Sequence, residues 1–291
     1  MGKVHEALSR AQNASDELDL FDEVEEGQDG QSEPAPEKFH FMRYSLGATA
    51  TIVAKDQAKR GPANAALAPR EPARPVREVT LIPERVDPHL VAFFNYDPRA
   101  TQEYNRLALS LISKAAERGL KRVLVASAQE GEGRTCVTLN LACALARARQ
   151  RVLVVDCDLL NPSVVRLLGL NPEIGLYEAF DRAMPPGAAA ITIRPYGFNV
   201  LPTIRPVDNP AELLAAPGFW KMLQSFDADH DFILFDSSPL ATGGDSSLLV
   251  RFTDSTLMVV RAGQTSSAQM AKALAPFAQD DILGVVINRA D

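Results

Sequence analysis

A short loop in the middle of the chain combines residue types that bind phosphate groups. Residues 127–135, SAQEGEGRT, follow an apolar run at 123–126 and precede a helical pattern. Glycines at 131 and 133 let the backbone bend so that successive amides point inward, and a helix start adds the positive end of its dipole. A hydroxyl at residue 135 suits a magnesium ion between two phosphates. The sequence therefore predicts an ATP and Mg2+ site, with phosphate-binding residues Gly131, Glu132, Gly133, Arg134, Thr135 and Cys136.

The loop departs from the common GxxxxGK[ST] pattern at two positions. Ala128 stands for the first glycine, and Arg134 stands for the lysine. Arginine keeps the positive charge but presents a longer, planar fork. Nucleotide binding should survive this change in weakened or altered form. Catalysis should be more sensitive, because it depends on placement to within about an ångström.

Three aspartates follow apolar runs that are predicted to be strands. Asp156 and Asp158 follow the run at 152–155, and Asp236 follows the run at 232–235. Ligands of parallel sheets lie beyond the carboxyl ends of the strands, so these carboxylates should face the phosphate loop. Asp236 is predicted as an outer-sphere Mg2+ ligand, with Thr135 beside the metal. The alternative is that the aspartates only cap helices.

The same three carboxylates are candidates for catalysis. Asp156 could hold a water of the metal or act as the base toward an attacking hydroxyl. Asp158 could support the metal's ligands or position the acceptor. The predicted catalytic residues are therefore Asp156, Asp158 and Arg134, and the predicted metal ligands are Thr135, Asp236 and Asp156.

These residues need a parallel sheet to position them. Further apolar runs at 198–201, 257–260 and 283–287 predict strands, and helical patterns cover 135–148, 210–226 and 266–277. Runs this apolar suit strands that are buried on both faces. The predicted fold is an α/β, Rossmann-like P-loop NTPase, with a mostly parallel sheet covered by helices on both faces.

The 291 residues divide into three predicted zones. Residues 1–15 form a short amphipathic helix, which is either a frayed end or a docking helix for a partner. Residues 16–85 are first acidic and then rich in proline and alanine, which predicts a mostly disordered linker. The short aromatic run at 39–42 could pack or bind a partner. Residues 86–291 form the nucleotide-binding domain.

The overall composition excludes several classes of protein. The net charge is -7, the opposite of the basic excess of a general nucleic-acid binder. Cys136, Cys143 and Cys157 lack the spacing of a zinc site or a disulfide framework, which favours buried thiols in a reducing compartment. No signal peptide and no apolar run of membrane-spanning length is present. We therefore expect a cytoplasmic protein that reaches a membrane only through a partner.

Several motifs, in order along residues 97–291, resemble the cytoplasmic domain of the bacterial tyrosine kinases of capsule and exopolysaccharide synthesis. That family shares its P-loop branch with septum-placement and chromosome-partition ATPases. The opening KVHEAL at 3–8 also resembles family members whose kinase is a separate chain. The matching segments are 127–133 of the phosphate loop, VVDCDL at 154–159 with Pro162, NPAELL at 209–214, FDSSP at 235–239 with Asp245, VVRAG at 259–263 and LGVVINR at 283–289.

This resemblance implies phosphoryl transfer from ATP to protein tyrosine, including tyrosines of a neighbouring subunit in a homo-oligomer. It places Asn288 and Arg289 near the adenine. It also implies an activating partner, a membrane-embedded polysaccharide chain-length regulator or co-polymerase, which would recruit the chain to the inner face of the membrane.

The chain departs from the family pattern in four ways. Its last tyrosine is Tyr196, so the usual tyrosine-rich tail is missing. Glu103 and Arg106 of a ring-forming helix pattern remain, but the third position is Leu109. Leu160 stands where an arginine usually follows the second acidic motif. The fourth departure is the arginine of the phosphate loop.

Three functions remain open on this evidence. The first is an active kinase that acts on other proteins or on its own Tyr104 or Tyr177. The second is a catalytically weak nucleotide-binding scaffold of the same export system. The third is a partition-type positioning ATPase, which is disfavoured because Gln129 occupies the place of the lysine that such proteins carry near the start of the loop.

Overall fold

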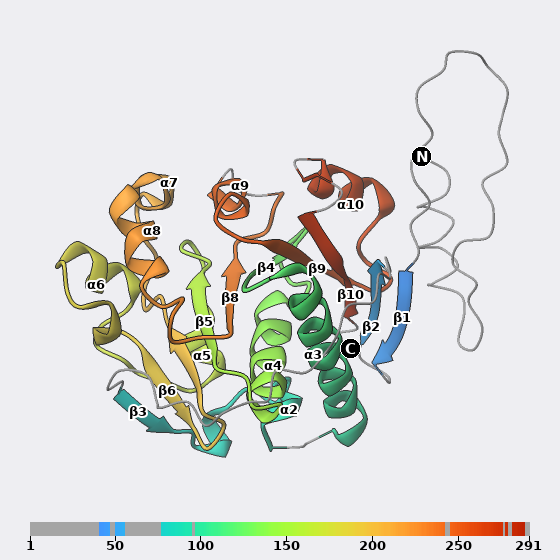
Figure 1. Cartoon of the computed structure of the whole chain (residues 1–291), viewed down its shortest axis with the longest axis horizontal. Helices are drawn as coiled ribbons and strands as arrows, with labels where there is room; N and C mark the ends of the chain where they lie inside the picture. Colours follow the sequence, from blue (N-terminus) through green and yellow to red (C-terminus); the bar gives the residue numbers. More distant parts are fainter. Residues whose placement is uncertain are drawn as a thin grey trace, which may run out of the picture.

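The apolar runs of the sequence pair into one sheet of ten strands (Figure 1). The structure is a computed structural model that describes residues 41–46, 50–55, 77–94, 97–241, 245–275, 277–278 and 281–288. The strand order is β1-β2-β10-β9-β4-β8-β5-β7-β6-β3. The strands are β1 (Phe41–Leu46), β2 (Ala50–Lys55), β3 (Arg77–Thr80), β4 (Arg122–Ser127), β5 (Val152–Cys157), β6 (Ile191–Arg194), β7 (Phe198–Leu201), β8 (Phe232–Ser237), β9 (Ser255–Arg261) and β10 (Ile282–Asn288).

The centre of the sheet is parallel, as the sequence predicts. Strands β10, β9, β4, β8, β5 and β7 are joined by parallel pairs, whereas β1–β2, β2–β10 and β6–β7 are antiparallel. Every residue of β5 and β8 is buried. Their register places Asp156 opposite Asp236, so two of the predicted site residues leave the sheet at the same edge.

Helices cover both faces of the sheet, which confirms the predicted fold class. Alternate residues of β4 belong to two different apolar clusters. Val123 and Val125 pack with α3 and α4, whereas Leu124 and Ala126 pack with the side that carries α7 and α8. The helices are α2 (Val91–Phe94), α3 (Pro98–Arg118), α4 (Arg134–Arg147), α5 (Val164–Leu167), α6 (Leu176–Asp181), α7 (Pro210–Ala215), α8 (Pro217–Gln224), α9 (Asp245–Val250) and α10 (Ser267–Leu274), with 3-10 turns η1 (Pro83–Arg85) and η2 (Pro186–Ala188).

The helix predicted at 210–226 is wrong in one respect, because it is two helices. Ala216 lies between α7 and α8 with an extended backbone, φ −72° and ψ 119°. Pro217 opens α8, and a proline disfavours helical backbone in the residue before it. The same ring suits the first turn of a helix, where an amide donor is not needed. The proline at residue 217 therefore accounts for the break between α7 and α8.

Three strands lie within residues 16–85, the stretch that the sequence assigns to the linker. β3 pairs with β6 at one edge of the sheet, and the β1–β2 hairpin extends the other edge beside β10. In β3 only Val79 is even partly buried. An edge strand is held by backbone hydrogen bonds to its neighbour and needs few apolar side chains. Its sequence therefore shows only a weak alternation of apolar and polar residues. Residues 1–15 and the rest of 16–76 lie outside the described residues.

In the part of the chain that the structure describes, none of the helices combines the length and hydropathy of a membrane-spanning segment.

Candidate functional site

The predicted phosphate loop joins β4 to α4 at the carboxyl edge of the sheet. Gly131 and Gly133 have φ values of +79° and +83°, in the left-handed region that favours glycine. A Cβ atom at residue 133 would lie 2.1 Å from Nδ2 of Asn288. The same Nδ2 donates a hydrogen bond to the carbonyl oxygen of Glu132 at 3.0 Å. Asn288, at the end of β10, therefore fixes the loop from the neighbouring strand.

The Glu132 side chain shapes the loop from inside. One of its oxygens, Oε2, accepts a hydrogen bond from the amide of Gln129 at 2.8 Å, and Oε1 accepts one from the hydroxyl of Thr265. Glu132 is only 4% exposed to solvent. Both carboxylate oxygens thus already accept hydrogen bonds from the protein, and Glu132 can contact a phosphate only through its main chain. Sequence reasoning missed Thr265, because the segment after β9 carries no motif that points to the loop.

Thr135 and Asp236 lie together, as predicted. The Thr135 hydroxyl donates to Oδ2 of Asp236 at 2.7 Å, and Thr138 reaches Oδ1 of the same carboxylate at 3.3 Å. Ser163, which caps α5, donates to Thr135 Oγ1 at 3.0 Å. The first turn of α4, the end of β8 and the start of α5 therefore meet at one point. Ser163 could not be found from the sequence, because only the packing of α5 against α4 brings it here.

Asp156 lies directly behind this corner and is completely buried. Its carboxylate accepts hydrogen bonds from the amides of Asp158 at 3.2 Å and Val164 at 3.4 Å. Burial raises the pKa of Asp156 well above its ordinary value, and the negative charges of Asp236 and Asp158 act in the same direction. Burial also raises the pKa of Asp236, while the guanidinium of Arg134 opposes that rise.

Arg134 turns its guanidinium inward, toward the acids. Nη2 donates to Oδ2 of Asp158 at 2.7 Å and Nη1 donates to the hydroxyl of Ser127 at 2.7 Å. Nε lies 3.4 Å from Oδ1 of Asp236 but makes no hydrogen bond. Arg134 is only 7% exposed. The residue that replaces the usual lysine is therefore the buried counter-ion of two site aspartates.

Of the three site aspartates, Asp158 is the one in contact with the cavity. Its Oδ1 accepts hydrogen bonds from the Ser238 hydroxyl at 3.1 Å and from the Asn161 amide at 3.2 Å. Burial raises the pKa of Asp158, and the charge of Arg134 acts against that rise. Asp158 lines the cavity beside the loop, whereas Asp156 and Asp236 lie behind its wall.

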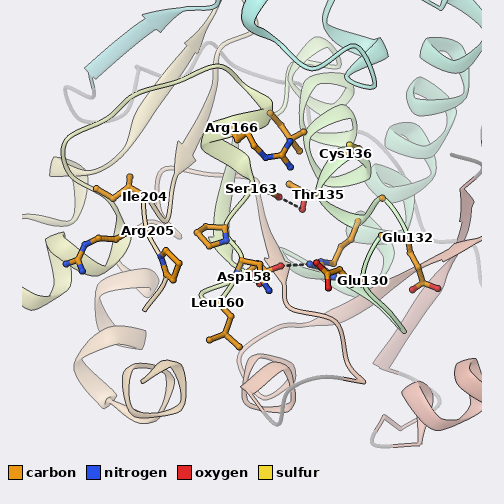
Figure 2. Close-up of a pocket in the computed structure, with 17 residues that line it drawn as sticks. Glu130, Glu132, Thr135, Cys136, Asp158, Leu160, Ser163, Arg166, Ile204 and Arg205 are labelled. Carbon is orange, nitrogen blue, oxygen red and sulfur yellow. Dashed lines mark hydrogen bonds and ion pairs between the residues drawn. The ribbon is translucent and has the colours of Figure 1, made fainter. Parts of the chain in front are cut away.

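That cavity has a volume of about 610 Å³, which is within the range of ligand sites (Figure 2). Its walls come from the phosphate loop, from the connection between β5 and α5, and from the segment after β7. Figure 2 shows Glu130 and Glu132 of the loop on one side of the space and Ile204 and Arg205 on the other. The lining residues are 130–136, Asp158, 160–163, Arg166, Leu167 and 204–206.

Cys136 lines the cavity at the first turn of α4. Burial raises its pKa to about 12, so it stays a neutral thiol near pH 7. Cys143 and Cys157 are buried, as predicted, whereas Cys136 is only half-buried. Among the described residues, no three His, Cys, Asp or Glu side chains form a metal cluster by themselves. Arg289 and the side chain of Asp245 lie outside the described residues.

The helix pattern of the resemblance lies on α3. Arg106 forms an ion pair with Glu103 within the helix, and Leu109 is 62% exposed. Of the two tyrosines considered as acceptors, Tyr104 is buried. Tyr177 is half-buried, with the guanidinium of Arg205 5.5 Å from its ring centre.

The loop, the acidic strand ends and the parallel sheet together define a P-loop nucleotide-binding protein. The ParA family model, described as NUBPL iron-transfer P-loop NTPase, matches residues 120–290. Because this match covers more than half of the chain, the chain belongs to the ParA family of P-loop NTPases. A nucleotide is therefore the ligand class of the fold.

Similar proteins bear the names that the motifs indicate, which confirms the resemblance to bacterial tyrosine kinases. The tyrosine-protein kinase YwqD of Bacillus subtilis (strain 168) is 26% identical over 206 residues, 70% of this chain and 87% of YwqD. The succinoglycan biosynthesis transport protein ExoP of Rhizobium meliloti (strain 1021) is 25% identical over 205 residues, 67% of this chain but only 26% of ExoP.

The fold also matches a solved kinase domain. The kinase domain of the Escherichia coli tyrosine kinase ETK superposes with a TM-score of 0.65 at 23% identity, over 71% of this chain and 81% of that domain. At this identity the match concerns the fold, and the chemistry must be argued from the site itself.

Proposed function

We propose that this chain binds ATP with Mg2+ in the cavity beside the phosphate loop and transfers the γ-phosphoryl group to protein tyrosine. The transfer would regulate the synthesis and export of exopolysaccharide or capsule. The observation that carries the proposal is the 2.7 Å contact between the Thr135 hydroxyl and Asp236, at the foot of a cavity walled by a glycine loop. The names of YwqD and ExoP support the tyrosine chemistry and the export role.

The donors at this corner fit a magnesium ion. Asp156 and Asp236 stand opposite each other in register, both completely buried, and Thr135 presents a hydroxyl to the same point. Mg2+ takes oxygen ligands, usually one or two carboxylates together with phosphate oxygens. Bound there, it would supply positive charge against the phosphates. Burial raises the pKa values of both carboxyl groups, and so do neighbouring acids: Asp236 and Asp158 for Asp156, and Asp158 for Asp236. Beside the metal both groups would be stabilised as carboxylates.

The remaining residues take roles that follow from their positions. Main-chain amides of residues 131–136 would hold the phosphates, and Asn288 with Arg289 would lie toward the adenine. Asp158 lines the cavity and Asp156 does not, so we assign the contact with the acceptor hydroxyl to Asp158. In the transfer, the tyrosine oxygen bonds to the γ-phosphorus, the bond to ADP breaks, and the phenolic proton passes to that carboxylate.

The proposed context is a polysaccharide export system. A membrane-embedded chain-length regulator or co-polymerase would activate the chain and recruit it to the inner face of the membrane. A homo-oligomer would bring tyrosines of one subunit to the site of the next. The half-buried Tyr177, beside the cavity-lining Arg205, is the better acceptor within the chain, because Tyr104 is buried.

A calorimetric titration with ATP and Mg2+, paired with a phosphotyrosine assay on the same sample, tests the proposal. We expect magnesium-dependent binding and phosphotyrosine formation. Asp156→Ala should abolish the phosphotyrosine signal, because it removes a carboxylate from the metal corner. Asp208→Ala, at an exposed aspartate outside the cavity, should keep it. A native protein that takes up no nucleotide would refute the proposal.

A second candidate, a nucleotide-dependent scaffold of the same system, is favoured by one observation. The guanidinium of Arg134 is held by Asp158 and Ser127 and does not project freely into the cavity. A loop cation held this way cannot reach a phosphate unless it leaves both partners. The scaffold would bind ATP or ADP with negligible turnover, so fast phosphoryl transfer by the native protein rules it out.

A further inference from the structure

The arginine of the phosphate loop is not free to meet a phosphate, and the inference drawn from this rests on the nucleotide binding proposed above. Three carboxylates, those of Glu130, Glu132 and Asp158, belong to residues that line the cavity. A triphosphate adds several negative charges, which proteins usually offset with Lys or Arg in addition to the metal. Arg134 does not fill that role in this structure, because it is the counter-ion of Asp158 and Asp236.

The cavity has two other arginines, and their situations differ. Arg205 donates through Nε to Oε1 of Glu178 at 2.8 Å and lies over the ring of Tyr177. Arg166 is exposed on α5, and within the described part of the chain its side chain forms no hydrogen bond or ion pair. Of the cavity-lining guanidinium groups, the one at residue 166 therefore needs to break no contact to take a new partner.

The backbone directs Arg166 toward the phosphate loop. It follows Ser163 by three residues, and residues three apart lie on the same face of a helix. Ser163 donates to the Thr135 hydroxyl at 3.0 Å, so this face of α5 looks onto the first turn of α4. Figure 2 shows Arg166 near Ser163 and Thr135, and all three line the same cavity.

We propose that Arg166 is the side-chain cation that contacts the terminal phosphates of the bound nucleotide. It takes the place that the loop pattern gives to residue 134, which is here the internal counter-ion of the acids. A guanidinium can grip two phosphate oxygens at once. The contact should favour ATP over ADP, and ADP over AMP, because it lies at the end of the phosphate chain beyond the loop amides.

Titrations of the full chain with ATP, ADP and AMP in the presence of Mg2+ test this assignment. Arg166→Ala should weaken ATP binding about tenfold or more, which is the loss of one charge-assisted hydrogen bond. ADP binding should weaken less, and AMP binding should not change. Arg166→Lys should recover most of the ATP affinity. Arg182→Ala removes an exposed arginine from the turn that follows α6 and controls for net charge, so its nucleotide affinities should equal those of the native chain.

The outcomes separate the two proposals. If the native chain binds ATP and Arg166→Ala binds it within twofold as tightly, Arg166 is not the phosphate cation, and nucleotide binding still stands. An equal loss for ATP, ADP and AMP would also overturn the assignment, since it would indicate a structural role. A native chain that binds none of the three nucleotides rejects the proposed function, and this inference falls with it.

Discussion

The arginine of the phosphate loop shows how one residue can keep its charge and still change its role. A lysine would present a compact ammonium group, whereas Arg134 has a fork long enough to reach three groups at once. Those groups are Ser127, Asp158 and Asp236. The inward turn balances the acids, which would otherwise carry an uncompensated buried charge. The charge is therefore used to hold the site together before any ligand binds.

A lysine at residue 134 tests whether the inward position of the Arg134 guanidinium limits the rate of phosphoryl transfer. Arg134→Lys cannot bridge Ser127 and both aspartates, so its ammonium should be free to meet the phosphates. We expect phosphotyrosine formation to rise about tenfold or more, as befits one well-placed electrostatic donor. Arg151→Lys, at an arginine paired with Asp231 outside the site, should leave the rate unchanged. A lower rate in Arg134→Lys would show that the arginine itself acts in the transfer.

At the scale of elements, the site depends on how the loop is fixed between β4, α4 and β10. Its two left-handed glycines meet different surroundings. A Cβ atom at residue 131 would meet nothing within 4 Å, whereas one at residue 133 would meet the Asn288 amide. That amide holds the carbonyl of Glu132. β10 thus fixes the position of the loop that follows β4, although the two segments lie more than 150 residues apart in the chain.

This difference predicts unequal costs for two similar substitutions. Gly131→Ala should cost about 1–2 kcal/mol of unfolding free energy for the left-handed backbone alone. Gly133→Ala should cost about 1 kcal/mol more, because Asn288 must also give up its hydrogen bond. In an Asn288→Ala background the two costs should become equal. Urea unfolding of the single and double variants measures this, and an excess that persists without Asn288 contradicts the account.

For the whole molecule, three aspartates share one buried corner of a single sheet, and this makes stability depend on pH. Burial and mutual repulsion raise the pKa of Asp156 above its ordinary value of 3.8. The folded state then binds this proton more tightly than the unfolded state does. The contribution of Asp156 to stability is therefore greatest at low pH, and it falls as pH rises from about 3.8 through the raised pKa.

An uncharged variant should remove that part of the dependence. Relative to the native chain, Asp156→Asn should gain unfolding free energy as pH rises from about 4, by at most about 1.4 kcal/mol per pH unit. Asp208→Asn, at an exposed position, should differ from the native chain by a constant amount. Unfolding titrations between pH 4 and 8 provide the comparison. A difference for Asp156→Asn that does not change with pH contradicts the buried charge.

Much of the fold could be predicted because the parallel strands are local apolar runs. The pairs of β4, β5 and β8 follow from runs that can only be buried on both faces. Edge strands such as β3 could not be found this way, since they gain their hydrogen bonds from a neighbour and hide little apolar surface. The break at Ala216 was readable from Pro217, but the continuous helical pattern around it obscured it.

Local sequence patterns are enough to predict the main parts of this site, which are a glycine loop before a helix and aspartates at the ends of strands. Those features are local, because each depends on a few neighbouring residues and on where a buried strand must end. The packing of distant segments, in contrast, sets the direction of Arg134 toward the acids and places Ser163 and Arg166 beside the loop. Such choices depend on contacts between distant segments, where burial and charge select the partner and spacing along the chain does not.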